Sequence, residues 1–239
     1  MSARRASTTS ASSLPNGPER LRIGGLTRWT SIDYPGRLAA VVFLQGCPWR
    51  CVYCHNTGLL DANAETQLAW SEVRRFLESR RGLLDGVVFS GGEPTLQPAL
   101  GAALDDVRAM GFQAVLHTGG MYPERLAELL HCLDWVGLDI KAPWSRLDPV
   151  TGGRGSAARV KASLVHVMHS GVRYECRTTW HPGLFPFDEL QLLASSPASL
   201  GVKDWALQMA RGGAPSAPLP QEACAAFAAQ FERFTLRPA

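Results

Sequence analysis

The stretch Phe43–Asn56 reads Phe-Leu-Gln-Gly-Cys-Pro-Trp-Arg-Cys-Val-Tyr-Cys-His-Asn and places Cys47, Cys51 and Cys54 in one short loop. Thiolates gathered this closely are metal ligands far more often than packing residues. Zinc sites usually take four ligands in two cysteine pairs, and no second pair is present. Three thiolates instead suit a [4Fe–4S] cluster with one iron open to a small molecule.

An apolar run leads into this loop. Residues 38–44 are continuously apolar, as is typical of a strand buried on both faces of a parallel sheet. The cysteines follow at the carboxyl end of that strand, where ligands bind in α/β folds. No G-x-G-x-x-G follows the strand, so a Rossmann sheet is disfavoured.

Farther along the chain, apolar strand segments alternate with segments of helical periodicity. This alternation predicts βα units and a parallel sheet. About six units with polar or glycine-rich strand ends favour an α/β fold built as a partial (β/α)6 barrel. The expected strands are 21–26, 38–44, 86–90, 114–117, 135–140, 172–179 and 204–209, and the expected helices are 68–80, 100–110, 124–133, 157–169, 187–193 and 221–234.

Composition describes one globular domain. The 239 residues are 46% hydrophobic and 19% charged, and the net charge of +3 is too small to indicate nucleic acid. No apolar run approaches the ~20 residues of a membrane span, so we expect a soluble, cytoplasmic protein without a membrane partner. Residues 1–20, rich in Ser, Ala, Thr and Arg, predict a disordered tail, with a faint likeness to a transit peptide, before a domain at 21–239.

Two further motifs follow predicted strands. Gly91-Gly92-Glu93-Pro94 comes directly after the strand at 86–90. Glycines let a backbone approach a ligand closely, and a carboxylate there can pair with a ligand's ammonium group. Asp139 and Lys141 lie two apart on a strand and therefore face the same side. Such a pair is also a common surface ion pair.

The C-x3-C-x-aromatic-C loop resembles that of the radical S-adenosylmethionine superfamily, and the resemblance extends from Leu21 to about Met209. It implies that Cys47, Cys51 and Cys54 hold the cluster, whose open iron chelates the amino and carboxylate groups of S-adenosylmethionine. The reduced cluster of that family cleaves the sulfonium to methionine and a 5′-deoxyadenosyl radical.

The resemblance also implies roles for residues around the cofactor. Tyr53, at the aromatic position, would pack near the adenine, although a buried aromatic anchoring the loop is equally compatible. Gly91, Gly92 and Glu93 match the family's second motif. Thr118 lies in the segment that lines the methionine and ribose portion in relatives.

On the next strands, Lys141 would pair with the cofactor carboxylate, and Asp139 would hold a monovalent cation or the ligand. Arg177, on the strand at 172–179, could reach the same carboxylate. The last strand carries Gln208 where pyruvate formate-lyase-type activases have a histidine-bearing motif. This difference from the pyruvate formate-lyase-type activases concerns both the expected monovalent-cation site and the identity of the partner protein.

Within the superfamily, four segments are similar to activating proteins of anaerobic ribonucleoside-triphosphate reductase: Ile23–Thr27, Ser31–Gly36, Tyr53–Asn56 and Gly137–Lys141. The resemblance implies an enzyme that generates a glycyl radical on such a reductase. A flavodoxin or ferredoxin would supply the electron, because no second cluster is encoded.

Two alternatives remain at this stage. A radical enzyme of the same family could act on a small molecule or peptide, as a carboxy-deazaguanine synthase-like enzyme does. A non-catalytic zinc or iron–sulfur protein could serve as a scaffold or electron carrier. His55 could complete a Cys3His zinc site, but its position next to Cys54 is poor for reaching the same ion.

Overall fold

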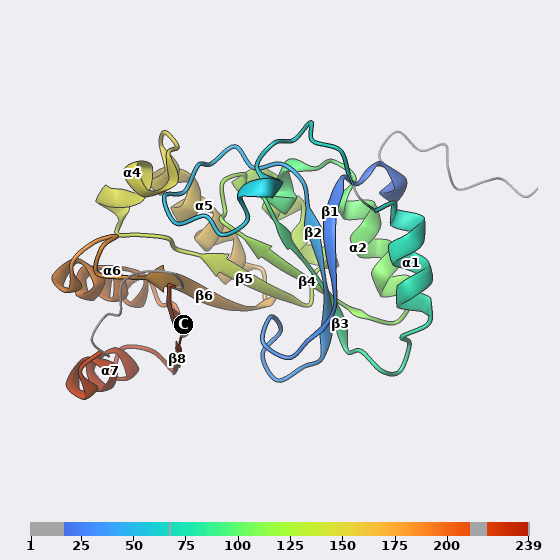
Figure 1. Ribbon diagram of the computed structural model, residues 1–239. Coiled ribbons are helices and arrows are strands. Elements are labelled where there is room, and N and C mark those ends of the chain that lie inside the picture. Colours follow the sequence, from blue (N-terminus) through green and yellow to red (C-terminus); the bar gives the residue numbers. More distant parts are fainter. Residues whose placement is uncertain (1–16, 67, 211–218, 239) are drawn as a thin grey trace, which may run out of the picture.

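The computed structural model describes residues 17–66, 68–210 and 219–238. Its centre is one eight-stranded sheet in which the spatial order of the strands is their chain order (Figure 1). Strands β2 to β8 run parallel, and β1 runs antiparallel to β2. The strands are β1 (Ile23–Thr30), β2 (Ala39–Leu44), β3 (Gly86–Gly91), β4 (Gln113–Thr118), β5 (Trp135–Asp139), β6 (Arg173–Trp180), β7 (Asp204–Met209) and β8 (Arg233–Arg237).

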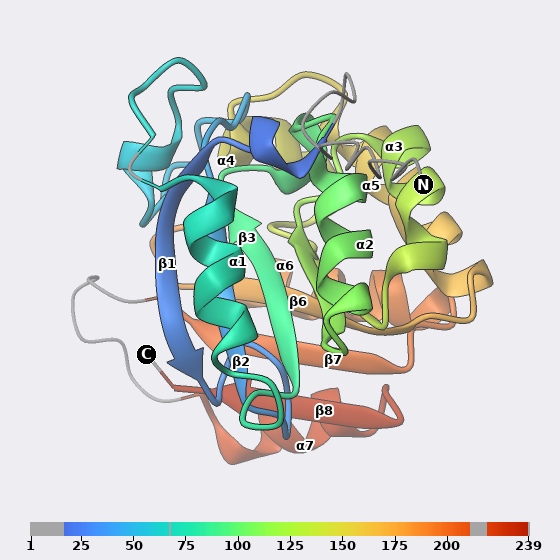
Figure 2. The same cartoon turned by 90° about the vertical axis from the view of Figure 1, so that its right-hand side faces the viewer.

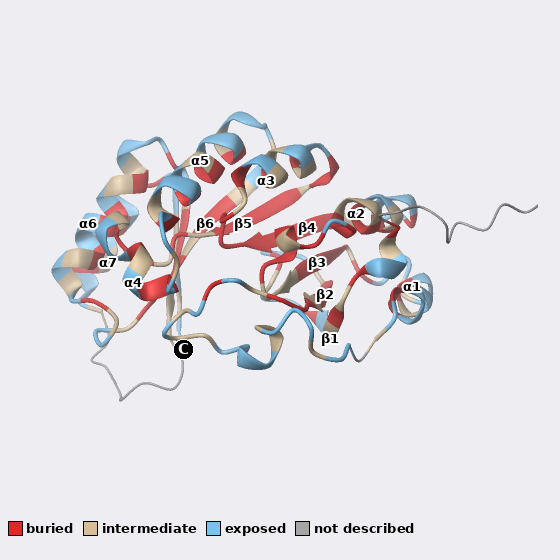
Figure 3. Cartoon of the chain, turned by 90° about the horizontal axis from the view of Figure 1, so that it is seen from above, coloured by how far each residue is buried: buried red, intermediate tan, exposed pale blue. Residues whose placement is uncertain are grey.

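Helices connect the parallel strands and cover the outer face of the curved sheet (Figure 3). None of the helices in the described ranges is both long and apolar enough to cross a membrane. The helices are α1 (Trp70–Glu78), α2 (Leu100–Ala109), α3 (Pro123–Leu129), α4 (Leu147–Thr151), α5 (Ser156–His169), α6 (Phe187–Ser199) and α7 (Gln221–Ala228).

Tryptophan 70 shows how the outer layer is held. It stacks on Phe89 of β3 at a centroid distance of 6.1 Å, and its indole N–H donates to Asp106 of α2 at 2.8 Å. Trp70 is fully buried, so this contact removes a large apolar surface from water while its one polar atom is satisfied. The helices α1 and α2 therefore lie side by side over β3 (Figure 2).

Alternation along the strands gives the sheet two different faces. Outward residues such as Val42 and Leu116 join the large core beneath the helices. Inward residues such as Val41 and Val115 form a second, smaller core with Tyr34. The inner face is therefore apolar near the amino ends of the strands.

The loop between β1 and β2 closes that amino end. Tyr34 is almost fully buried; its hydroxyl donates to Gln113 Oε1 of β4 at 3.0 Å and accepts from Arg173 Nη2 of β6 at 2.8 Å. The neighbouring Asp33 carbonyl lies 2.8 Å from His117 Nε2. With the amino end plugged, the carboxyl ends of the strands are left for a site.

Two predicted elements need correction. The strand expected at 21–26 is Ile23–Thr30 and is antiparallel, because the loop to β2 is too short for a helical crossover. The helix expected to reach Phe234 ends at Ala228, and β8 follows it. The ring centroids of Phe234 and Trp205 lie 5.5 Å apart. This packing favours a strand beside β7 over a longer helix.

The predicted tail falls mostly on residues 1–16, which lie outside the described residues. Its last part, Pro18–Arg20, forms a short 3-10 helix, and Leu21 directly after it is buried. The ordered domain therefore includes a few residues that the composition had assigned to the tail.

Candidate functional site

The cysteine loop leaves the carboxyl end of β2 and is tied to the chain that follows it. The Gly46 N–H donates to the Leu59 carbonyl at 2.8 Å. Gln45 is buried, and its side-chain amide donates to the carbonyls of Gly58 at 3.0 Å and Asp61 at 2.7 Å. A buried amide with two carbonyl partners fixes the path of the loop.

A second brace comes from α4. The N–H groups of Arg50 and Val52 donate to the carbonyls of Thr151 at 2.8 Å and Val150 at 3.0 Å. This pair of backbone bonds resembles a short strand pairing and holds the middle of the cysteine loop against α4. The loop is therefore supported from two sides before any metal is bound.

Trp49 lies inside the loop and is buried. A Cβ atom on Gly119, or on Gly153 next to α4, would overlap its indole ring. The two glycines thus leave the space that Trp49 fills. The sequence analysis did not single out this tryptophan, although an aromatic residue between the first two cysteines was a usable signal.

The three cysteines line one cavity of about 210 Å³ at the carboxyl ends of the strands. Every predicted site residue lines the same cavity. These residues are Cys47, Cys51, Tyr53, Cys54, Gly91, Gly92, Glu93, Thr118, Asp139, Lys141 and Arg177. Residues that the sequence analysis did not propose for the site also line it: Trp49, His55, Asn56, Leu60, Ser90, His117, Gly119 and Thr179.

A larger, open depression of about 1000 Å³ lies elsewhere, between the ends of α3 and α5. Asp134 and Arg173, which line it, belong to the amino ends of β5 and β6. Ligands in parallel α/β folds bind at the opposite ends of the strands. We therefore regard the smaller cavity as the candidate site.

The chemistry of the thiols fits a cluster. Burial raises the pKa of Cys47 to about 11 and also raises that of Cys51, so both are protonated at neutral pH until a cation binds. In the part of the chain that the structure describes, no three His, Cys, Asp or Glu side chains could hold one metal ion together. In a four-iron cluster each thiolate binds a different iron, so these donors suit a cluster better than a single zinc ion.

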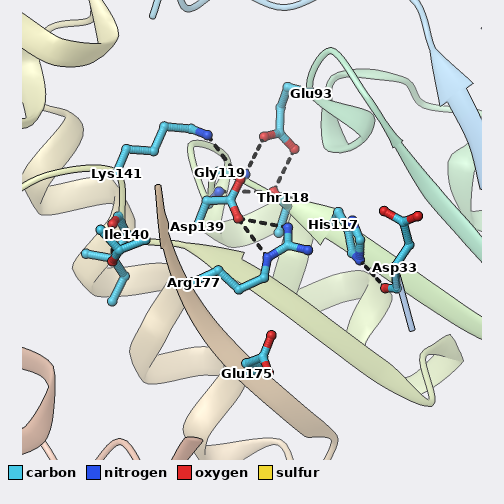
Figure 4. A network of polar contacts seen from close by, with 12 residues as sticks. Asp33, Glu93, His117, Thr118, Gly119, Asp139, Ile140, Lys141, Glu175 and Arg177 are labelled. Atoms are coloured by element: carbon cyan, nitrogen blue, oxygen red, sulfur yellow. Dashed lines mark hydrogen bonds and ion pairs between the residues drawn. The ribbon is translucent and has the colours of Figure 1, made fainter. Parts of the chain in front are cut away.

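Glu93 connects the ends of β3 and β4 through its hydrogen bonds. One carboxylate oxygen accepts from the Thr95 hydroxyl at 2.5 Å and the Thr118 hydroxyl at 2.7 Å, and also from the Thr95 N–H. The other oxygen accepts from the Gly119 N–H at 2.9 Å (Figure 4). Glu93 is 2% exposed, and these donors stabilise its buried carboxylate. Its second oxygen has one protein donor, and Glu93 is among the residues that line the cavity.

Gly91 and Gly92 allow the same strand end to pack on the cysteine loop. A Cβ atom on Gly91 would overlap the backbone nitrogen of Leu44, and one on Gly92 would overlap the carbonyl of Gly46. The Gly92 N–H donates to Leu44 and the Glu93 N–H to Gly46, both at 2.9 Å. These glycines are needed for the approach of two backbones, in addition to any approach to a ligand.

Across the cavity, Asp139 lies between two cations (Figure 4). Lys141 Nζ is 3.0 Å from one carboxylate oxygen, and Arg177 Nη2 is 2.8 Å from the other. Burial alone would raise the pKa of Asp139, but Arg177 and Lys141 lower it well below its usual value. Burial alone would lower the pKa of Lys141, but the Asp139 carboxylate raises it above its usual value. Asp139 and Lys141 are therefore both charged at neutral pH.

Tyr53 lies beside this network. Lys141 Nζ is 5.9 Å from the centre of its ring, a cation–π geometry. Among the described residues its hydroxyl is buried and has no hydrogen-bond partner. Buried polar atoms are normally satisfied, so this hydroxyl is suited to receive a polar group of a bound ligand.

His117 also lines the cavity but is satisfied within the protein. Its ring is buried, its Nε2 lies 2.8 Å from the Asp33 carbonyl oxygen, and its centroid lies 5.8 Å from that of the tilted Trp135 ring. Burial lowers its pKa well below the usual value, and the positive charge of Arg177 lowers it further. His117 is thus a neutral wall residue, as expected for an isolated histidine.

A mostly parallel α/β sheet with three cysteines and a charged cavity at the carboxyl ends of its strands is the arrangement of a protein that binds a small polar ligand there. The model of the Radical SAM superfamily matches residues 41–189. The chain belongs to this superfamily, whose members use a [4Fe–4S] cluster and S-adenosylmethionine.

Relatives in sequence include several activating enzymes. A protein of Methanocaldococcus jannaschii named as a glycyl-radical enzyme activating enzyme is 29% identical over 181 residues, which cover 73% of this chain and 74% of the relative. The pyruvate formate-lyase-activating enzyme of Clostridium pasteurianum is 35% identical over 50% of this chain and 52% of its own length. The chain thus spans about half the length of that relative.

Solved structures share the fold. Streptococcus suis SuiB bound to S-adenosylmethionine superposes with a TM-score of 0.62 at 14% identity, covering 81% of this chain and 48% of SuiB. QueE from Escherichia coli superposes with a TM-score of 0.55 at 19% identity, covering 91% and 93% of the two chains. These likenesses confirm the α/β architecture expected from the sequence.

Proposed function

We propose that this protein is an activating enzyme that generates a glycyl radical on a partner protein, an anaerobic ribonucleoside-triphosphate reductase or a close relative of it. The single observation that carries the proposal is the cavity itself. Three cysteines from one loop line it together with charged residues on or just after β3, β5 and β6. The sequence relatives named as glycyl-radical activating enzymes support a protein substrate over a small molecule.

In this proposal Cys47, Cys51 and Cys54 hold the [4Fe–4S] cluster. When bound and reduced, the cluster supplies the electron that cleaves S-adenosylmethionine to methionine and a 5′-deoxyadenosyl radical, which takes a hydrogen atom from the partner's glycine. The role of the protein's own residues is to bind the cofactor, to orient it and to exclude water from it.

The charged residues divide the recognition of the cofactor between them. Lys141 and Arg177 offer two cations for the carboxylate of S-adenosylmethionine, and Asp139 holds both in place. Glu93, whose second oxygen has one protein donor, offers a negative charge to the ammonium group. Thr118 and Tyr53 line the cavity between these groups, and the unpartnered Tyr53 hydroxyl adds a polar contact.

A monovalent cation near Asp139 stays part of the proposal. Both oxygens of this carboxylate already lie within 3.0 Å of protein cations, so a metal cation must compete with Lys141 or Arg177. Cofactor cleavage measured in potassium, sodium and choline salts at equal ionic strength tests this part. Equal rates in all three contradict a cation site.

The central test is anaerobic reconstitution with iron and sulfide. For Cys51→Ala we expect loss of most bound iron and of 5′-deoxyadenosine formation with dithionite as reductant. Cys224→Ala is the matched control, because Cys224 lies on α7 and does not line the cavity. Full iron content and full cofactor cleavage in Cys51→Ala contradict the assignment.

The partner is tested by electron paramagnetic resonance. The protein is incubated with a co-expressed anaerobic reductase, S-adenosylmethionine and dithionite. We expect a glycyl-radical signal on the reductase that Cys51→Ala does not give. Cofactor cleavage without any such signal would instead favour a small molecule or peptide as substrate.

A further inference from the structure

The surface beside the cysteine loop has an unusual charge distribution. Residues 47–60 and 149–174 contain no aspartate or glutamate, although the whole chain has 21 of them. The cations Arg50, Arg154 and Arg159 lie in these two segments and are exposed. The chain as a whole has a net charge of only +3, so positive charge is concentrated here.

The two segments adjoin one another. The backbone bonds from the Arg50 N–H to Thr151 and from the Val52 N–H to Val150 join the cysteine loop to α4. A Cβ atom on Gly152 would lie 3.4 Å from Cβ of Arg50. The basic loop that follows α4 is thus packed directly on the loop that carries the cysteines, and Figure 1 shows both along the same edge of the molecule.

The loop after α4 has a fixed shape. The Asp148 carboxylate accepts from the N–H groups of Gly155 at 2.9 Å and Ser156 at 2.8 Å. Asp148 is the nearest acid in the sequence, and its oxygens are used within the loop. No carboxylate of the described residues is within ion-pair distance of Arg154 or Arg159, so both positive charges are presented to solvent.

An exposed apolar side chain lies on the cysteine loop two residues from Arg50. Val52 is 67% exposed although its neighbours Cys51 and Tyr53 are partly buried and line the cavity. An apolar centre with a charged rim is the composition of many protein–protein interfaces. The backbone of Val52 is one residue from a proposed cluster ligand.

We propose that this surface, formed by Arg50, Val52, Arg154 and Arg159, is the docking site of an acidic one-electron carrier protein. The inference rests on the proposed function, which requires one electron per cofactor cleaved. The remaining cysteines, Cys132, Cys176 and Cys224, lie on three separate elements: the 3-10 helix Leu130–Cys132, β6 and α7. In the proposed reaction the electron comes from another protein, which has to approach the loop that carries Cys47, Cys51 and Cys54.

The positive charge of this surface indicates which kind of molecule binds it. A negatively charged carrier is attracted by the three arginines, and the attraction weakens as salt screens it. A nucleic acid or an anionic membrane would meet the same charges, but neither carries the electron that the proposed reaction requires. The proposal therefore commits to a small acidic protein, with a flavodoxin as the probe.

The test measures binding and reduction separately. Arg154→Glu/Arg159→Glu is compared with Arg75→Glu/Arg81→Glu, which changes the net charge equally. Arg75 lies on α1, and Arg81 precedes β3 at the amino end of the sheet, away from the cysteines. Binding of recombinant oxidised flavodoxin to the cluster-loaded protein is measured by calorimetry at low and at physiological ionic strength.

We expect the first variant to weaken flavodoxin binding by about tenfold or more at low salt and the control by less than about twofold. Cofactor cleavage driven by reduced flavodoxin should fall in parallel, whereas cleavage driven by dithionite should match the wild type. Equal binding in all three proteins, equal weakening in both variants, or no wild-type binding at low salt overturns the docking site.

Two results separate this inference from the proposed function. If dithionite fails to drive cofactor cleavage in the wild type, the proposed function fails, and the calorimetry still decides the docking site. If the arginine variant activates the reductase poorly even with dithionite, the surface belongs to the substrate protein. That result overturns the assignment to an electron carrier.

Discussion

At the scale of single residues, Asp139 has the most consequential surroundings. Its two neighbours Lys141 and Arg177 have side chains only 18% and 16% exposed. Removing one partner of a buried charge pair leaves the others uncompensated, which typically costs about 3–5 kcal/mol. The structural role of Asp139 is therefore separable from any role toward a ligand.

We predict that Asp139→Asn lowers the free energy of unfolding by about 3 kcal/mol in urea at pH 7. The control is Glu232→Gln, which removes the exposed ion pair with Lys203 and should leave the urea midpoint unchanged. Because the pKa of Asp139 is lowered in the folded protein, its contribution is present above about pH 4 and is lost below it. The difference in free energy of unfolding between the wild type and Asp139→Asn should thus be constant from pH 7 to 5.

His117 gives a second prediction with a defined pH window. Its pKa is lowered on folding, so the unfolded chain binds a proton below about pH 6.5 that the folded chain does not. Above that pH the stability that this pKa difference provides is fully present. Below it, the free energy of unfolding falls by up to about 1.4 kcal/mol per pH unit. His117→Gln should therefore lose less stability than the wild type between pH 7.5 and 5.5 in urea titrations. Identical pH dependence would mean that His117 is protonated in the folded state.

Which residues meet at the site could be predicted because each lies on a predicted strand or shortly after one. Their contacts could not be predicted in the same way. That the oxygens of Glu93 accept from Thr95, Thr118 and Gly119 depends on the offset between β3 and β4, which spacing along the chain does not define. Trp49 was missed for a similar reason, since the glycines that make room for it come from distant segments.

At the scale of elements, the contact between the end of β3 and the cysteine loop is the most sensitive junction. Gly91 has a φ of 113° and lies against the backbone of Leu44. Gly111, with a φ of 92°, has open space around its α-carbon. The two positions separate backbone strain from steric overlap.

We predict that Gly111→Ala costs about 1–2 kcal/mol through backbone strain alone. Gly91→Ala should cost more than about 4 kcal/mol, because its Cβ atom also displaces the β2 backbone. Urea midpoints measure both, and iron content after reconstitution should fall only in the second variant. Equal midpoints would show that the β2 end moves freely.

The elements that were wrongly predicted are those at the sheet edges. The inner strands β2 and β3 are almost continuously apolar, and every inner strand is followed or preceded by a helical segment, so their positions could be predicted from the sequence. The edge strand β8 reads Arg-Phe-Thr-Leu-Arg and has only one residue, Phe234, that packs on Trp205. An alanine-rich helix precedes it, so local pattern favoured an extended helix. The direction of β1 depended on the length of its connection, which is too short for a crossover.

At the scale of the whole molecule, Tyr34 links parts of the sheet that are far apart in the chain. Its hydroxyl joins Gln113 and Arg173, so the β1–β2 loop crosses beneath β4 and β6. A partial barrel was predicted, but this plug was not, because nothing in a turn sequence shows what it will cover. The plug explains why the inner face has one open polar end.

We predict that Tyr34→Phe lowers the free energy of unfolding by about 1 kcal/mol, because the buried hydroxyl's bonds to half-buried Gln113 and exposed Arg173 are lost. In an Arg173→Ala background the same change should cost less, since one bond is already missing. Urea denaturation of the four proteins measures the difference. An equal cost in both backgrounds would contradict the bridge.

The agreement between spatial and chain order of the eight strands also bears on how the protein is made. No strand has to be inserted between two that are already paired, so the sheet can grow from β1 onward as the chain leaves the ribosome. Each new strand finds its neighbour as the most recently formed edge, which keeps loop closures short and exposes only one growing edge to aggregation. The strands of this fold can therefore pair in the same order in which the ribosome synthesises them.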